Sequence, residues 1–150
     1  NTGGVDATTV SGGGLAAPYT FKGGAYPGAG GTCGTTIASA ATCTIVVNYS
    51  PSATGVQADT IELTYNDGVT ASQTSNRDIT GTGAAPATIT ISDGATYNYG
   101  SIANGGSSDK TFTVSNTGGV SATSLSGSGL AAPFTFKGGS YPGSGGTCST

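Results

Sequence analysis

The chain opens with NTGGVDATTVSGGGLAAPYTFKGGAYPGAGGTCGT, residues 1–35, and the same stretch returns at 116–150 as NTGGVSATSLSGSGLAAPFTFKGGSYPGSGGTCST. Of the 35 positions, 27 are identical, and every offset is 115. Self-similarity at a fixed period means that one structural unit has been copied, and this period is the size of one small domain. We therefore expect tandem domains with a 115-residue period, and we expect this chain to begin and end inside repeat units.

Composition favours a folded β protein with a neutral surface. The 150 residues include 28 Gly but no His, Met or Trp, and only 7% are charged, against about 25% in an ordinary soluble domain. Thr, Val and Ile occur in short runs, which is typical of strands and not of disordered chains. The net charge of −3 argues against nucleic acid as a partner, and no apolar run approaches the roughly 18 residues of a membrane span, so no membrane insertion is expected.

Short runs of alternating apolar and polar residues predict the strands. Residues 87–91 and 110–115 are two of them, and the turn signal Asn-Thr-Gly-Gly follows at 116–119. We expect these two strands to take part in contacts between copies. The residues on their apolar faces are Ala87, Ile89, Ile91, Phe112 and Val114.

Further strands are expected at 7–10, 19–22, 43–50, 61–65 and near Ile79. The run at 43–50 is the most apolar, so we predict that it is the most buried strand, and Pro51 ends it because proline cannot donate to a strand ladder. Asn66-Asp67-Gly68 is a strong hairpin signal, with the returning arm beginning at Val69.

About seven short strands without helical periodicity predict an all-β, antiparallel β-sandwich. The Gly/Ala/Pro segment at 81–86 is the expected boundary between units. Residues 1–86 would then be a repeat without its first two strands, and 87–150 would be the N-terminal part of the next repeat. Two stacked sheets need both inner faces filled, so we predict that another copy, or a longer array, supplies the missing strands.

Three cysteines indicate the redox compartment. Cys33 and Cys43 are separated by nine residues, and Cys148 repeats Cys33 at the 115-residue offset, without a partner in this chain. A zinc site needs four ligands, and the chain has no histidine, so a Cys33–Cys43 disulfide is favoured over a metal site. A reactive thiol is disfavoured because no neighbouring base lowers the thiol pKa. A disulfide places the protein outside a reducing cytosol, in an extracellular or cell-surface location.

The order of these motifs resembles a bacterial family, the choice-of-anchor D repeats, which are immunoglobulin-like domains related to the ASH and major-sperm-protein group. The matching pieces are a strand ending in Asn-Thr-Gly118, the C-x9-C pair, the strand from Cys43 into Ser-Pro-Ser-Ala-Thr-Gly55, and Asp59-Thr-Ile-Glu-Leu-Thr-Tyr65. The resemblance covers nearly the whole unit. It implies an immunoglobulin-like sandwich used as an extracellular repeat module, and it carries no catalytic residues.

Several motifs suggest chemistry that the sequence does not support. The glycine-rich runs at 28–31 and 143–146 lack the Lys-Ser/Thr and helix that a phosphate cradle needs, so they are interpreted as loops or close backbone packing. Acid–base catalysis is not expected from Asp59, Glu62 and Asp67, which have no histidine partner. Calcium at Asp67 or Asp93 is disfavoured because six or more oxygen ligands are required.

The sequence also contains two candidate modification sites and one set of repeated aromatic residues. An isopeptide bond from Lys22 or Lys137 would rest on analogy with other surface sandwiches alone, and the sequon at Asn48 lies on a strand expected to be buried. Core packing is favoured over a sugar-binding patch for the aromatic residues. These are Tyr19, Phe21 and Tyr26, with their copies Phe134, Phe136 and Tyr141.

Taken together, the sequence predicts an extracellular structural module, not an enzyme, that forms a bacterial stalk, fibre or filament with other copies of itself. No cofactor is expected. The alternative is an adhesin-type module that binds a glycan or a cell-surface protein. Buried aromatic rings would count against the alternative, and rings exposed beside a groove would favour it.

Overall fold

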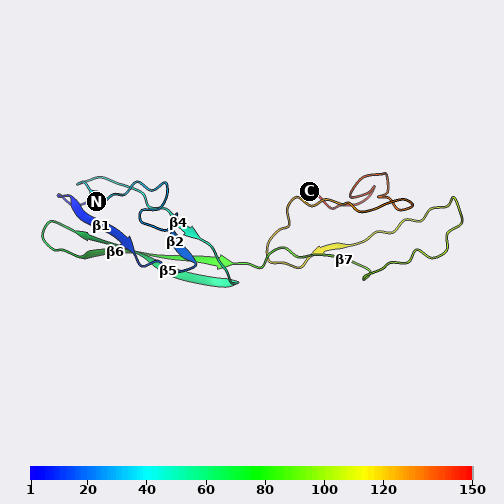
Figure 1. The fold of residues 1–150 in the computed structure, drawn as a ribbon, viewed down its shortest axis with the longest axis horizontal. Coiled ribbons are helices and arrows are strands. Elements are labelled where there is room, and N and C mark those ends of the chain that lie inside the picture. Colours follow the sequence, from blue (N-terminus) through cyan, green and yellow to red (C-terminus); the bar gives the residue numbers. More distant parts are fainter. Residues whose placement is uncertain (150) are drawn as a thin grey trace. The chain divides into compact units, whose positions relative to one another are not determined.

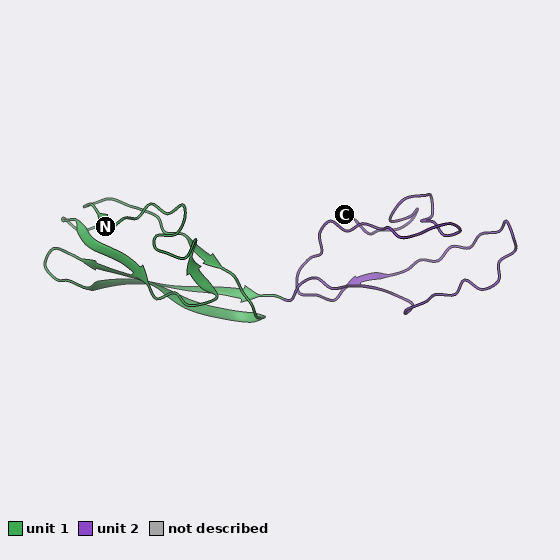
Figure 2. Ribbon diagram, in the orientation of Figure 1, with its two compact units in different colours: residues 1–84 green, residues 85–150 purple. Residues whose placement is uncertain are grey.

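The computed structural model describes residues 1–149, and over that range the protein is all-β, with antiparallel sheets and no helix. The chain forms two compact units, Asn1–Ala84 and Ala85–Thr150 (Figure 2). This division lies two residues before the boundary that the Gly/Ala/Pro segment suggests. Among the described residues there is no helix with the length and hydrophobicity that a bilayer span requires.

Unit 1 is built on a four-stranded antiparallel sheet in the order β3-β1-β5-β6. The bounds are Ala7–Gly13 for β1, Thr36–Ile37 for β3, Gly55–Asn66 for β5 and Gln73–Gly83 for β6. Along β5 and β6, eleven residue pairs are in register, from Gly55↔Gly83 to Tyr65↔Gln73, and the two strands run side by side in Figure 1. This hairpin is the longest strand pair of unit 1.

The predicted turn at Asn66-Asp67-Gly68 is confirmed, but the returning strand β6 begins at Gln73 and not at Val69, because residues 67–72 form the loop. Gly68 has φ +92°, a conformation that favours glycine, and its N–H donates to Asn66 Oδ1 at 2.8 Å. The Asp67 carboxylate accepts the N–H groups of Val69 at 2.9 Å and Thr70 at 2.7 Å. These bonds hold the pKa of Asp67 below its usual value, so the ionised side chain stabilises the turn.

A two-stranded sheet of β2 (Tyr19–Phe21) and β4 (Val47–Tyr49) packs against the four-stranded sheet. The Tyr19 hydroxyl donates to Gln57 O at 2.9 Å, and the Tyr49 hydroxyl donates to Gln57 Oε1 at 2.8 Å, so β2 and β4 are both joined to β5. The arrangement is consistent with a β-sandwich. Its buried core consists of Ala7, Val10, Tyr19, Phe21, Cys33 and Ile61.

Unit 2 contains one strand pair, β7 (Ile89–Ile91) with β8 (Val114–Asn116). The predicted strand at 87–91 is therefore present in part. Of the predicted strand at 110–115, only the last two residues are paired, and the strand extends to Asn116 instead. The remainder of 85–149 is made of turns and irregular segments.

Two other strand predictions were wrong in detail. The run at 43–50 contributes only β4, whose residues are half-buried or exposed and not the most buried of the chain, because Tyr19 and Phe21 of its partner β2 occupy the core. The separate strand near Ile79 is part of the continuous β6. The strand β3 was not predicted, since two residues are too few to show a period.

Candidate functional site

The disulfide predicted between Cys33 and Cys43 is present, with the two Cα atoms 4.8 Å apart. Cys33 is buried at 7% exposure. Beside it, Thr32 N donates to Thr44 O at 2.8 Å and the two threonine hydroxyls lie 3.1 Å apart, so polar contacts close the same loop. Cys148 is the free cysteine of the described residues. The disulfide indicates an oxidising, extracellular-type environment.

The turns of the duplicated segment recur in both units, although its strands β1 and β2 form only in unit 1. Asn1 Nδ2 donates to Val5 O at 2.8 Å, and its copy Asn116 donates to Val120 O at 2.8 Å. Five backbone bonds recur at the same offset, with distances that agree within 0.1 Å. In unit 1 they are Tyr19 N to Ala16 O, Gly24 N to Phe21 O, Gly28 N to Ala25 O, Ala29 N to Lys22 O and Gly31 N to Gly28 O.

Burial of the repeated aromatic residues differs sharply between the units. Tyr19 is 3% exposed and stacks on Tyr49 with ring centroids 4.7 Å apart, whereas its copy Phe134 is 54% exposed. Phe21 is buried at 7%, and its copy Phe136 is only half-buried. Tyr19 and Phe21 are core, as predicted, whereas Tyr26 and its copy Tyr141 are both half-buried. The residues that cover Tyr19 and Phe21 come from β4, β5 and β6, which have no counterparts in unit 2.

Strands β7 and β8 form an exposed apolar ribbon, defined here as residues 85–115. Ile91 pairs directly with Val114 across the two strands. The exposed fractions are 39% for Ile89, 64% for Ile91 and 36% for Phe112. The ribbon therefore presents large apolar side chains to solvent, which is unusual for a module with so few of them.

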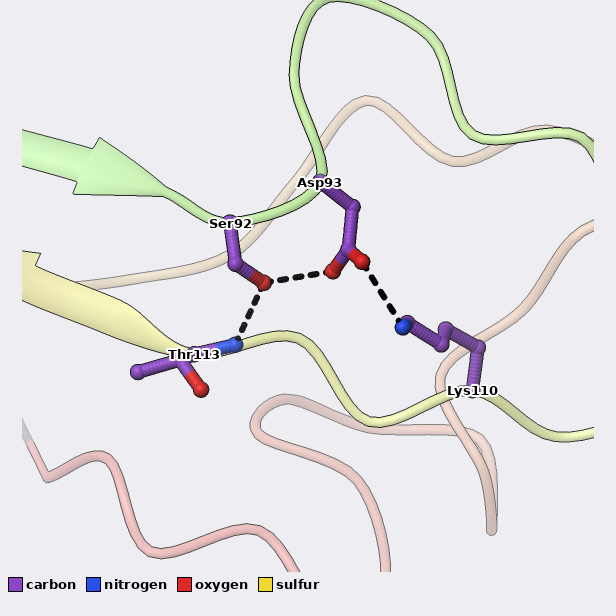
Figure 3. Close-up of polar contacts among 4 residues, drawn as sticks. All are labelled: Ser92, Asp93, Lys110 and Thr113. Atoms are coloured by element: carbon purple, nitrogen blue, oxygen red, sulfur yellow. Dashed lines mark hydrogen bonds and ion pairs between the residues drawn. The ribbon is translucent and has the colours of Figure 1, made fainter.

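A polar clamp joins the two arms of the ribbon beyond β7 (Figure 3). Asp93 accepts hydrogen bonds from the Ser92 hydroxyl at 2.6 Å and from Lys110 Nζ at 2.9 Å, and Thr113 N donates to Ser92 Oγ at 3.0 Å. The Ser92 and Lys110 bonds lower the pKa of Asp93, and the Asp93 bond raises the pKa of Lys110. The Lys110 ammonium also lies 4.7 Å from the Tyr97 ring centroid, a distance suited to a cation–π interaction.

Three of the four acidic candidates for catalysis or metal binding, Asp59, Asp67 and Asp93, make a local contact. Asp59 Oδ2 accepts Ala16 N at 2.8 Å, Asp67 caps its turn, and Asp93 is paired with Lys110. Within residues 1–149, no group of three or more His, Cys, Asp or Glu residues lies close enough to hold a metal ion. Glu62 is half-buried on β5, and the described contacts bring it to no other acid.

The other candidate positions are structural or solvent-exposed. A Cβ at Gly28 would collide with Val46 O, so this glycine-rich run is close backbone packing, as interpreted. Lys137 is 59% exposed and pairs with Asp109 at 2.7 Å, and Lys22 is exposed, which does not fit the buried lysine of an isopeptide bond. Asn48 is exposed rather than buried, so the sequence argument against its sequon was wrong on that point.

No family model, curated protein or solved structure matches this chain. The interpretation of its function therefore depends on the strands and contacts described above.

Proposed function

We propose that this protein is an extracellular structural module whose immunoglobulin-like repeats join into a bacterial surface stalk, fibre or filament. The single observation that carries the proposal is that the two units hold complementary parts of one sandwich. Unit 1 contains the sheet β3-β1-β5-β6 and the pair β2-β4, whereas unit 2 contains the pair β7-β8.

The strand order of the immunoglobulin fold relates these parts. In that fold, strands A, B, E and D form one sheet in this order, and C, F and G form the other. If β7 and β8 are strands A and B, then β1 is C, β2 is D, β4 is E, β5 is F and β6 is G. The observed orders β1-β5-β6 and β2-β4 then match C-F-G and D-E, whereas β3, which follows β2 in the chain, is an addition beside β1. The assignment leaves strand E without strand B in unit 1.

The repeated segment supports a tandem arrangement of such units. Residues 1–35 and 116–150 adopt the same turns although only unit 1 has the strands that cover them. Each repeat thus determines its own turns, as expected in a tandem array. In such an array each unit contacts only its neighbours, and the free energies of unfolding of the units add approximately along the chain. The Cys33–Cys43 disulfide would oppose local opening of each unit outside the cell.

Electron microscopy of protein purified from the surface of expressing cells, with and without reductant, tests the proposal. We expect extended threads or stalks in both samples, and threads that break more readily after reduction. Short particles of uniform size in the unreduced sample would contradict the fibre function.

An adhesin-type binding module for a glycan or cell-surface protein is the second candidate, favoured by the exposed Phe134 of unit 2. Against it, the matching Tyr19 of unit 1 is core. A glycan array probed with the chain separates the two functions, since specific binding that Phe134→Ala abolishes would support the adhesin.

A further inference from the structure

We propose that Asn104 is a site of spontaneous deamidation, where the protein converts its own asparagine into aspartate and isoaspartate without an enzyme. The reacting atoms belong to Asn104 and Gly105 alone, so the reaction needs no other copy of the chain and no other part of the fold. Such a modification is independent of the structural function proposed above, and either can fail without the other.

Asn104 is the one asparagine that is followed directly by glycine. The chain has seven asparagines, and the residues that follow the other six are Thr, Tyr, Asp or Arg. Deamidation begins when the backbone nitrogen of the next residue attacks the side-chain carbonyl carbon of the asparagine, and a Cβ on that residue hinders the approach. Glycine has no Cβ and reaches conformations that other residues rarely adopt. Asn104 therefore has the least hindered attacking nitrogen of the seven.

The turn around Asn104 leaves the reacting groups free. Its backbone closes through the Gly106 N–H, which donates to Ala103 O at 2.8 Å. Gly105 has φ +86°, and the position that a Cβ would take there has no atom within 4 Å. Asn104 is exposed, and within residues 1–149 neither its side chain nor the Gly105 N–H takes part in a hydrogen bond. The amide nitrogen can therefore attack the side chain without first giving up a hydrogen bond.

The other asparagines are held differently. In four of them the side-chain oxygen accepts the N–H group two residues ahead, at 2.8–3.0 Å, and these four are Asn1, Asn66, Asn98 and Asn116. Such a bond restricts the rotation that would bring the side-chain carbon to the next backbone nitrogen. The remaining two, Asn48 and Asn76, lie on the paired strands β4 and β6. Among the described residues, Asn104 alone combines a following glycine with a side chain that is not hydrogen-bonded.

The reaction requires only water, and its atoms balance. The Gly105 nitrogen forms a bond to Asn104 Cγ while the bond from Cγ to Nδ2 breaks, and ammonia leaves with the proton of the Gly105 N–H. The product is a cyclic succinimide, which water opens at one of its two carbonyls. Breaking the bond between Cγ and the Gly105 nitrogen gives aspartate. Breaking the bond between that nitrogen and the Asn104 backbone carbonyl carbon gives isoaspartate.

The chain also has two Asp-Gly pairs, which begin at Asp67 and Asp93 and form the same ring by loss of water. An ionised carboxylate resists the attack because it already carries negative charge. Backbone hydrogen bonds in its turn hold the pKa of Asp67 below its usual value, and the Ser92 and Lys110 bonds do the same for Asp93. Both acids therefore stay ionised near neutral pH, and ring formation there should be slower than at the neutral amide of Asn104.

Deamidation changes both the charge and the backbone of the turn. Aspartate and isoaspartate each replace a neutral amide with a carboxylate, which is ionised at neutral pH. The net charge of −3 therefore becomes more negative by one unit per chain. Isoaspartate also adds a carbon atom to the main chain inside the turn, so the bond between Gly106 N and Ala103 O should weaken. Older protein should thus be a mixture of charge forms, in which the share of acidic forms increases with age.

The test is incubation of the full chain in sterile buffer at mildly alkaline pH, followed by denaturation, trypsin digestion and tandem mass spectrometry. Trypsin cleaves after Arg77 and Lys110, so one peptide, residues 78–110, contains both Asn104 and the reference Asn98. We expect Asn104 to be converted about 5- to 150-fold faster than Asn98, because an attacking residue with a Cβ must enter a sparsely populated conformation. An unincubated sample corrects for conversion during digestion. Equal rates at the two asparagines, or no conversion at Asn104, would overturn the proposal.

Variants of the full chain, followed by anion-exchange chromatography, test the assignment to this pair. Asn104→Gln should stop the accumulation of the acidic form, because attack on the longer side chain closes a less favourable, larger ring. Gly105→Ala should slow the accumulation about 5- to 150-fold, whereas the matched variant Ser107→Ala, outside the reacting pair, should behave like the parent. Because Gly105→Ala strains a positive φ, Asn104→Gln, which keeps Gly105, tests the site on its own. Accumulation at the parent's rate in either variant of the pair would overturn the proposal.

Discussion

Opening the Cys33–Cys43 disulfide should destabilise unit 1 by an amount that its loop length sets. The cysteines are ten residues apart, and the chain-entropy relation for a loop of this length gives about 2.7 kcal/mol at 25 °C. For a unit of 84 residues, a loss of this size corresponds to a fall in Tm of roughly 10–20 °C. The effect arises in the unfolded chain, which gains freedom once the loop is open.

Differential scanning calorimetry of a Cys148→Ser chain, with and without reductant, provides the measurement. The Cys148→Ser background removes the free thiol and should itself leave the Tm of unit 1 unchanged, because Cys148 belongs to unit 2. A Cys33→Ala/Cys43→Ala variant checks that the reductant acts through this bond. A fall in Tm of less than about 3 °C would refute the loop-entropy reasoning and would mean that the loop stays restricted in the unfolded state, for instance by residual contacts.

Three further outcomes follow from unit 1. Gly12→Ala should destabilise unit 1 by about 1–3 kcal/mol in urea denaturation, because a Cβ at this position would lie 2.7 Å from the Phe21 ring. A Cβ at the neighbouring Gly13 would have no atom within 4 Å, so Gly13→Ala should be close to neutral. Tyr19→Phe removes the bond to Gln57 O and should cost about 1 kcal/mol by the same assay; no change would mean that water already satisfies that carbonyl. The pKa of Asp67 is lowered in the folded state. Asp67 therefore contributes stability that is present above about pH 4 and is lost as the pH falls through the folded-state pKa. Between pH 5 and 2, the Tm of Asp67→Asn should fall less steeply than the Tm of the parent.

The sequence predicted those parts of the fold that depend on local chemistry. Asn66-Asp67-Gly68 specifies its hairpin because the three residues supply the turn's hydrogen bonds and its positive φ. The Cys33–Cys43 loop followed from residue spacing and the absence of other ligands. Burial could not be predicted in the same way: the apolar run at 43–50 resembles a buried strand, yet Tyr19 and Phe21 of its partner β2 occupy the core.

The free strand edges were also beyond sequence reasoning, because they depend on which backbone groups are already bonded. The strands at 87–91 and 110–115 were predicted to matter between copies from their alternating pattern. That pattern cannot say that the even-numbered groups of β8 are open, or that Asn1 bonds to Ala41. Both facts require the strand pairs themselves.

The contrast between Tyr19 and Phe134 bears most directly on the choice between a fibre and an adhesin. A ligand-binding patch should be exposed wherever its sequence occurs, because its function requires access. Here the same stretch keeps its turns in both units, yet the ring is 3% exposed where β4, β5 and β6 are present and 54% exposed where they are not. Exposure thus follows the presence of partner strands and not the stretch itself. The burial of Tyr19 in unit 1 therefore counts against a ligand-binding patch on this stretch.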